Sequence, residues 1–176
     1  MFCPCRTSGV VLQVLTRGLS LLTYVHTEIK QYIRWHATAA KNAVERAGFD
    51  GVEVHGANGY LVDQFLQDVS NARTDEYGGS IENRARFALE VMDALVDAVG
   101  ASRAAIRLSP WSRYQDMCMK DPVPQFTYLV DQLKQRHPNL AYLHVVTPGV
   151  MGSKGPEDES VRVCPLAIFS LSWSSR

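Results

Sequence analysis

The stretch FDGVEVHGANGY, residues 49–60, decides the fold, because a short apolar strand there runs directly into three polar side chains. Valines alternate with other residues in its first half, as in a β-strand, and glycines interrupt the pattern on both sides. The strand is predicted to end at about His55. In parallel α/β folds, side chains just beyond the carboxyl ends of strands carry ligands and chemistry. His55, Asn58 and Tyr60 are therefore candidate site residues by position.

Two longer helical patterns flank this strand. Residues 27–47 carry apolar side chains at helical spacing, with Thr27 as the expected N-cap and Gly48 as the expected stop. A second helix is expected over residues 81–99, where Ser80 can accept a hydrogen bond from the first turn. The order around the strand is therefore helix, strand, helix.

The following sequence continues this alternation. A helical turn is expected at 61–66, a strand at 104–108, a helix opened by Pro124 and a strand at 141–146. Strands that alternate with helices pair in parallel through right-handed crossovers. The predicted fold class is α/β, with about three consecutive parallel β/α units.

The two ends of the chain do not share the alternation. Residues 1–26 have an apolar tint, but polar and charged residues break the run well short of the roughly 20 apolar residues of a membrane span. Residues 151–176 extend no visible repeat of the unit. We expect irregular tails over 1–26 and 151–176, on either side of one folded segment at 27–150.

Composition narrows the class of partner. A chain of 176 residues fits one domain, and its 18 basic and 18 acidic residues cancel, so no long-range field attracts nucleic acid or an anionic membrane. A small-molecule substrate is the better expectation. The four cysteines have neither zinc-site nor disulfide-framework spacing, which favours a reducing, cytoplasmic setting. No pattern in the sequence specifies an oligomeric state.

His55 and Asn58 are three residues apart, so a tight turn would let both direct nitrogen donors at one point. Two donors that converge on a carbonyl oxygen stabilise charge developing there, and one such donor contributes about 3 to 4 kcal/mol. Tyr60 offers a phenol with a reference pKa of about 10, which could protonate a carbanion or enolate. A histidine that merely ends a strand, followed by an Asn-Gly turn, explains the local sequence equally well.

Arg107 lies inside an otherwise apolar strand, where a guanidinium needs an anion or an electron-rich ligand. Its side chain should emerge near His55 if the two strands are parallel neighbours. A structural ion pair is an equally weighted explanation. The charged residues of the segment 73–86 favour a loop that braces a helix start, and His144, in mid-strand, favours a satisfied core histidine. No histidine has partners at metal-ligand spacing, so no metal site is predicted.

Three motifs in order carry a resemblance to a known family. They are AAKNAVERAGFDGVEVHGANGYLVDQFLQDVSNARTDEYGGSIENRARFALEV, then IRLSP, then LAYLHVV followed by TP. Over residues 28–148 the sequence resembles the Old Yellow Enzyme family, the flavin-dependent ene-reductases, and most closely their fungal members. The family includes general enone reductases and enzymes of fungal secondary metabolism.

The resemblance implies a TIM barrel with FMN at its carboxyl-terminal mouth and reduction of an activated carbon-carbon double bond by NAD(P)H. It implies that His55 and Asn58 bind the carbonyl oxygen of an enone or enal, that Tyr60 protonates the α-carbon and that Arg107 lies beside the flavin pyrimidine. The three predicted strands correspond to the fourth, fifth and sixth of eight. The alternative is a truncated, catalytically inactive fragment that does not bind FMN.

Overall fold

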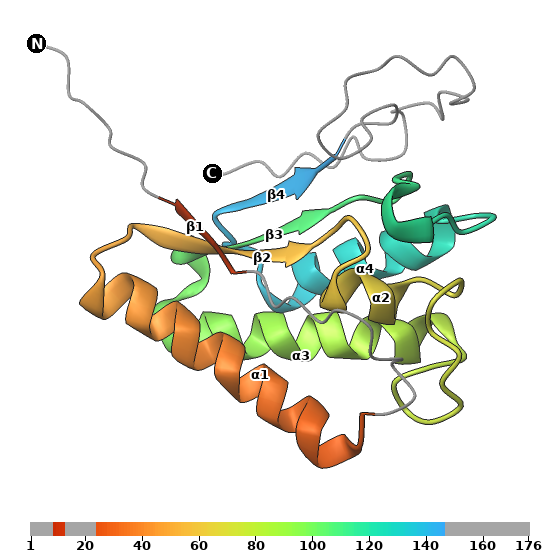
Figure 1. Cartoon of the computed structure of the whole chain (residues 1–176). Coiled ribbons are helices and arrows are strands. Elements are labelled where there is room, and N and C mark those ends of the chain that lie inside the picture. Colours follow the sequence, from red (N-terminus) through yellow and green to blue (C-terminus); the bar gives the residue numbers. More distant parts are fainter. Residues whose placement is uncertain (1–8, 13–23, 147–176) are drawn as a thin grey trace, which may run out of the picture.

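A computed structural model describes residues 9–12 and 24–146 of the chain. Within this part, four parallel strands form one sheet in the order β1, β2, β3, β4 (Figure 1). The strands are β1 (Gly9–Leu12), β2 (Gly51–Gly56), β3 (Ala104–Leu108) and β4 (Tyr142–Val145). Consecutive strands pair as neighbours, as repeated β/α units predict.

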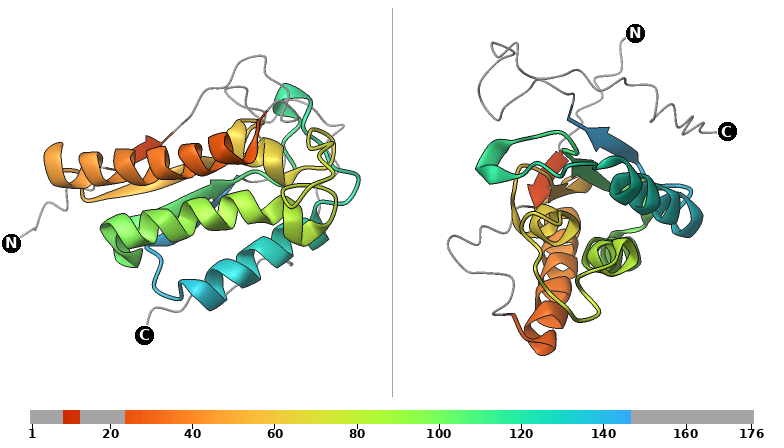
Figure 2. Two further views of the ribbon diagram at one scale, coloured as in Figure 1. Left: turned by 90° about the horizontal axis from the view of Figure 1, so that it is seen from below. Right: turned by 90° about the vertical axis from the view of Figure 1, so that its right-hand side faces the viewer.

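The helices lie on one face of this sheet. They are α1 (His26–Lys41), α2 (Leu61–Leu66), α3 (Ile81–Val99) and α4 (Val123–Arg136). A π-helical segment, Asn42–Arg46, continues α1, and two 3-10 turns occur at Ala101–Arg103 and Tyr114–Asp116. Helix α3 lies between α1 and α4 and contacts both (Figure 2). The described part therefore has two layers, helices on sheet.

Local signals predicted several elements correctly. Helix α3 has the expected bounds, and the Asn83 backbone N–H donates to the Ser80 hydroxyl at 3.3 Å. Helix α2 and strand β3 also have their expected bounds, 61–66 and 104–108. These elements combine a regular apolar pattern with a clear start or stop residue.

The start of α1 corrects a prediction. The helix begins at His26 rather than after Thr27, and Val25 is the N-cap residue. The Glu28 carboxylate accepts a hydrogen bond from the Val25 backbone N–H at 3.0 Å, which satisfies the donor just before the helix. The missed signal is this glutamate three residues beyond an apolar N-cap.

The end of the same helix corrects another. The expected apolar stripe would bury Val44 and Ala47, but the π-helical turn rotates it, so that Ala43 is buried, Val44 is partly buried and Ala47 is exposed. His36, expected at a surface or general helical position, is buried, and its Nδ1 lies 2.8 Å from the Tyr32 carbonyl oxygen. Gly48 has the expected positive φ, 75°.

The prediction of an irregular tail over residues 1–26 is wrong for Gly9–Leu12, which forms β1 and pairs in parallel with β2. The expected tail at 151–176 and the strand stop at Pro148 lie outside the described residues. No helix in the described ranges is long and apolar enough to cross a membrane.

The sheet has two chemically different faces. Side chains of Val54, Ile106 and Leu108 point toward the helices and belong to one apolar core with Phe87 and Leu129. Alternate residues on the same strands point the other way, because side chains alternate across a strand. This second face carries the polar residues of the candidate site.

Candidate active site

A row of polar side chains crosses the sheet near the carboxyl ends of its strands. His55 on β2 is the register partner of Arg107 on β3, and Arg107 is the partner of His144 on β4. Register partners in a parallel sheet present their side chains on the same face. The prediction that Arg107 emerges beside His55 is therefore confirmed.

The tight turn expected after β2 is present. Asn58 and Gly59 both adopt the left-handed conformation, with φ of 56° and 74°. Asparagine tolerates this region better than other non-glycine residues, and at Gly59 a Cβ would lie 2.8 Å from the Gln115 Cβ. Tyr60 follows as the N-cap residue of α2, and its ring centroid lies 5.1 Å from that of His55. The turn thus brings Tyr60 back over the strand end.

Several buried polar atoms in this group have no hydrogen-bond partner among the described residues. They are both ring nitrogens of His55, Oδ1 of Asn58 and Nε of Arg107. A buried polar group without a partner costs about 1 to 3 kcal/mol, so native proteins seldom leave several together. Their clustering at the strand ends is typical of a site that completes its hydrogen bonds with a ligand.

The charge state of His55 suits a hydrogen-bond donor. Burial lowers the pKa of its imidazole, and the Arg107 guanidinium lowers it further, while Glu53 opposes the shift. The ring is therefore neutral at pH 7, with one N–H donor and one acceptor nitrogen. A neutral imidazole N–H can donate a hydrogen bond to a carbonyl oxygen without transferring its proton to that oxygen.

Sequence reasoning missed a second pair on this face. The Glu53 carboxylate lies 3.1 Å from Nδ1 of His144, two strands away. His144 was predicted to be a satisfied core histidine; it has this partner, but its side chain is 42% exposed. The available signal was parity, since Glu53 lies two residues before His55 and so points to the same face.

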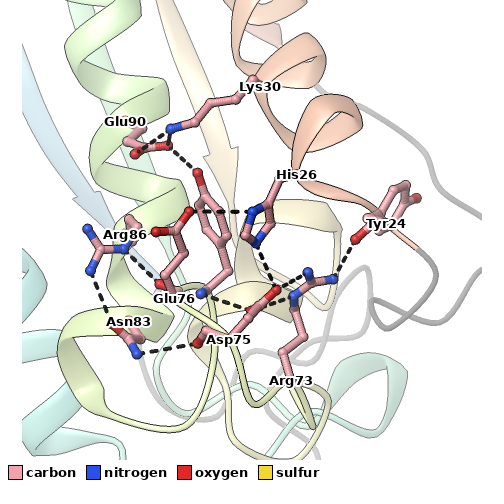
Figure 3. A network of polar contacts seen from close by, with 10 residues as sticks. Tyr24, His26, Lys30, Arg73, Asp75, Glu76, Asn83, Arg86 and Glu90 are labelled. Carbon is pink, nitrogen blue, oxygen red and sulfur yellow. Dashed lines mark hydrogen bonds and ion pairs between the residues drawn. The ribbon is translucent and has the colours of Figure 1, made fainter.

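The charged segment expected to brace a helix start does so. We call it the loop brace; its residues are His26, Lys30, Arg73, Asp75, Glu76, Tyr77, Asn83, Arg86 and Glu90 (Figure 3). Buried Arg73 binds Asp75 through two nitrogens and donates from Nη1 to the Tyr24 carbonyl oxygen at 2.9 Å. The residues of the loop brace bind one another, so we assign this segment a structural role.

The residues present fit a flavin at one position. The partly buried Arg107 lies beside His55, and its buried Nε has no hydrogen-bond partner among the described residues, which suits an electron-rich ring edge with carbonyl acceptors. In the part of the chain that the structure describes, no group of three or more His, Cys, Asp or Glu side chains could hold a metal ion.

Comparison with known proteins gives a consistent family. The sequence profile of the NADH:flavin oxidoreductase / NADH oxidase family matches residues 16–161. A chanoclavine-I aldehyde reductase of Penicillium roqueforti is 59% identical over 126 residues, 72% of this chain and 33% of that protein. Enoate reductase 1 of Kluyveromyces lactis is 55% identical over 138 residues, 75% of this chain and 34% of that protein.

Solved structures agree. The chain resembles Old Yellow Enzyme from Pichia sp. AKU4542 with a TM-score of 0.67 and 46% identity, over 69% of this chain and 33% of that one. Morphinone reductase in complex with tetrahydroNAD gives a TM-score of 0.65 and 46% identity, with coverage of 69% and 33%. The predicted fold class, a partial TIM barrel, is confirmed, and the chain spans about a third of the length of these relatives.

Proposed function

The chain belongs to the NADH:flavin oxidoreductase / NADH oxidase family, and we propose that it reduces the carbon-carbon double bond of α,β-unsaturated carbonyl compounds with FMN and NAD(P)H. The observation that carries this proposal is the cluster of buried polar atoms on His55, Asn58 and Arg107 that have no hydrogen-bond partner within the described part of the chain. A His55 ring nitrogen can donate to a carbonyl oxygen while the Arg107 Nε donates to a flavin edge beside it. The Asn58 atom in this cluster is Oδ1, an acceptor, so Asn58 would bind the carbonyl oxygen through its amide nitrogen.

Two of these residues would activate the substrate. His55, neutral and partly surrounded by protein, donates its N–H to the carbonyl oxygen of an enone or enal. The Asn58 amide nitrogen donates to the same oxygen from the adjoining turn. Donors held in place before the reaction stabilise the negative charge that develops on that oxygen, by about 3 to 4 kcal/mol for each one.

Tyr60 would supply the proton. Its ring packs against His55 at 5.1 Å between centroids, so a substrate held by His55 lies within reach of the phenol. Its phenol O–H can protonate the α-carbon as enolate charge builds there. General acid catalysis of this kind contributes about 10² to 10⁴ in rate.

Arg107 would bind the flavin. When bound, FMN supplies a hydride that it has taken from NAD(P)H. The guanidinium would donate to the pyrimidine edge from its Nε, which no described residue binds, and would hold that edge next to the His55 and Asn58 donors. The substrate carbonyl and the flavin are thereby oriented by neighbouring strands.

The test is direct. The purified chain is titrated with FMN, and enone-dependent oxidation of NADPH is then followed with cyclohexenone as substrate. We expect FMN binding and NADPH consumption that requires the enone. Bound FMN without any enone-dependent consumption would contradict the proposal for this chain.

A second candidate is a protein that retains the fold of these residues but does not bind FMN or catalyse. Two findings favour considering it: the chain spans about a third of its relatives' length, and one relative, 52% identical over 139 residues, is named a probable inactive dehydrogenase of Claviceps purpurea. It predicts that added FMN leaves the melting temperature unchanged. A ligand that binds the folded state raises that temperature, so a shift would exclude this candidate.

A further inference from the structure

The turn that carries Asn58 and Tyr60 has its central backbone groups bound by side chains. The Asn58 N–H donates to the Ser109 hydroxyl at 2.7 Å, and the Gly59 N–H donates to Oδ2 of Asp63 at 2.8 Å. The Asn58 and Gly59 carbonyl oxygens accept from the Gln115 and Gln64 side-chain amides at 2.9 Å and 2.8 Å. Four side chains thus hold two left-handed residues in place.

Asp63, like Ser109, has no exposed surface, and it is the only one of these four side chains that carries a carboxyl group. One carboxylate oxygen accepts from Gly59, and the other accepts from the Gln67 amide at 3.0 Å. The Ser109 hydroxyl is also near enough to the carboxyl group to favour its ionised form and so to lower its pKa. Because that hydroxyl oxygen already accepts from Asn58, its own proton is free to point toward Asp63.

This arrangement joins two strand ends through one carboxyl group. Asp63 lies in α2 and Ser109 directly follows β3. The turn that carries Asn58 lies between β2 and α2 in the sequence. The turn is therefore fixed to the strand that carries Arg107 as well as to its own helix. A shift of Asp63 would move Asn58 and Tyr60 relative to both His55 and Arg107.

Burying a carboxyl group costs free energy of folding, so its presence in the interior calls for an explanation. Burial raises the pKa of Asp63 to about 7, against the hydrogen bonds from Gln67, Gly59 and Ser109 that lower it. An apolar residue at this helix position would carry no such cost. The group that gains most from the carboxylate is the Gly59 N–H, which would otherwise be a buried donor in a strained turn.

We propose that Asp63 is a positioning residue for the reaction, which acts through the Gly59 backbone and Ser109 to hold Asn58 and Tyr60 in their reactive geometry. The inference rests on the proposed function. Asp63 has no exposed surface, so it would act without touching substrate or flavin. Its contribution is preorganisation, so its loss should lower kcat more than it raises KM for cyclohexenone.

Three variants test the proposal. Asp63→Asn keeps an acceptor oxygen of the same size, Asp63→Leu has similar size without an acceptor, and Asp131→Asn changes an exposed aspartate of α4 as a control. We expect D63L to lower kcat by about 100-fold, the order of loss known for small misplacements of catalytic groups, and D63N to restore most of it. Wild-type kcat in D63L, or a D63N variant as impaired as D63L, would overturn the proposal.

Amide exchange reports on the same contact without any activity. In D63L the Gly59 N–H should exchange at least about tenfold faster, the effect of one lost hydrogen bond, while D63N keeps its protection. The Gly100 N–H, bound to the Val96 carbonyl oxygen at the end of α3, should be unchanged in both. Equal Gly59 protection in wild type and D63L would overturn the proposal even if no enone is ever reduced.

A measurement on the unaltered chain decides the case in which D63L does not fold. The proton shift of the Gly59 N–H should titrate with a midpoint near pH 7 as Asp63 ionises. The titratable groups nearest the turn, His55 and Tyr60, are identified by their own ring signals. A Gly59 shift that follows only His55, or that stays constant while the Asp63 carboxyl carbon signal titrates, would overturn the proposal. Absence of ene reduction with a titrating Gly59 would instead count against the proposed function alone.

Discussion

The loop brace and the strand-end row, here the row His55, Arg107 and His144 together with Asn58 and Tyr60 of the adjoining turn, are both rich in polar side chains. The two regions satisfy the hydrogen-bonding groups of these side chains differently. In the brace, the Tyr77 hydroxyl and both contacts of Lys30 converge on Glu90 at 2.9 to 3.0 Å. In the row, His55 and Arg107 retain buried atoms without partners among the described residues. The brace recovers the cost of burying polar groups within the chain, whereas the row leaves it to be recovered by a ligand.

This difference separates supporting residues from reactive ones better than residue type does. Each region offers a tyrosine, an asparagine and an arginine. In the row they are Tyr60, Asn58 and Arg107. In the brace they are Tyr77 and Arg73, with Asn71 directly beside it. Matched substitutions in the two regions should therefore alter different quantities. Those in the brace should change stability, and those in the row should change turnover or flavin binding.

The tyrosine pair should give the largest contrast. Tyr60→Phe removes the proposed proton donor, and we expect kcat for cyclohexenone to fall by about 10² to 10⁴, with flavin binding retained. Tyr77→Phe removes the hydrogen bond to Glu90 and should lower the free energy of unfolding by about 1.5 to 3 kcal/mol, with kcat unchanged. Steady-state kinetics and urea unfolding of both variants check this. Equal kcat values would contradict the assignment of Tyr60.

The asparagine pair should differ in the same sense. Asn58→Gly keeps the positive φ of 56° but removes the amide donor. It should raise the activation free energy by about 3 to 4 kcal/mol and so lower kcat. Asn71→Ala removes donors to the Phe65 and Tyr77 carbonyl oxygens, both at 2.7 Å, and should act on stability. A stability loss in N58G with normal turnover would place Asn58 among the supporting residues.

Sequence alone predicted the elements whose signals are local. Helix α3 has its cap three residues from the amide that it binds, and the row followed from the rule that parallel strands present side chains at one edge. The missed features depend on distant partners. Ser109 reaches Asn58 across 51 residues and His144 reaches Glu53 across 91, and no spacing in the sequence specifies such contacts.

Strand β1 was missed for a related reason. Gly9–Leu12 becomes a strand by pairing with β2, and a four-residue segment has too little pattern of its own to be recognised. The buried role of Asp63 was equally hidden, because an aspartate in the first turn of a helix is ordinarily read as a favourable partner of the helix dipole. Burial, not residue type, separates the two explanations.

The arginine pair should give a smaller effect. Arg73→Met breaks a buried contact with Asp75 and with the Tyr24 carbonyl oxygen, and should lower the free energy of unfolding by about 1.5 to 3 kcal/mol. Arg107→Met should instead raise the Kd for FMN while the unfolding free energy of the flavin-free chain stays close to wild type. Fluorescence titration with FMN and urea unfolding check both. An unstable R107M with normal flavin affinity would favour the structural ion pair over the flavin contact.

Acid should act on the brace through Asp75 and on the row through His55, because a histidine whose pKa is lowered by burial costs stability when it is protonated below about pH 6.5. An Asp75 variant isolates the contribution of the brace. Arg73 hydrogen-bonds Asp75 and holds the pKa of that carboxyl well below its ordinary value of 3.8. A depressed pKa stabilises the folded state above the unfolded pKa, and this stability is lost as pH falls below about 4. Asp75 is 32% exposed, so solvent screening limits the loss to about 1 kcal/mol or less. Asp75→Asn should therefore show a shallower decline of unfolding free energy between pH 6 and 3 than the wild type. Equal declines in the two proteins would mean that the Asp75 carboxylate does not stabilise the folded state through its contacts in the brace.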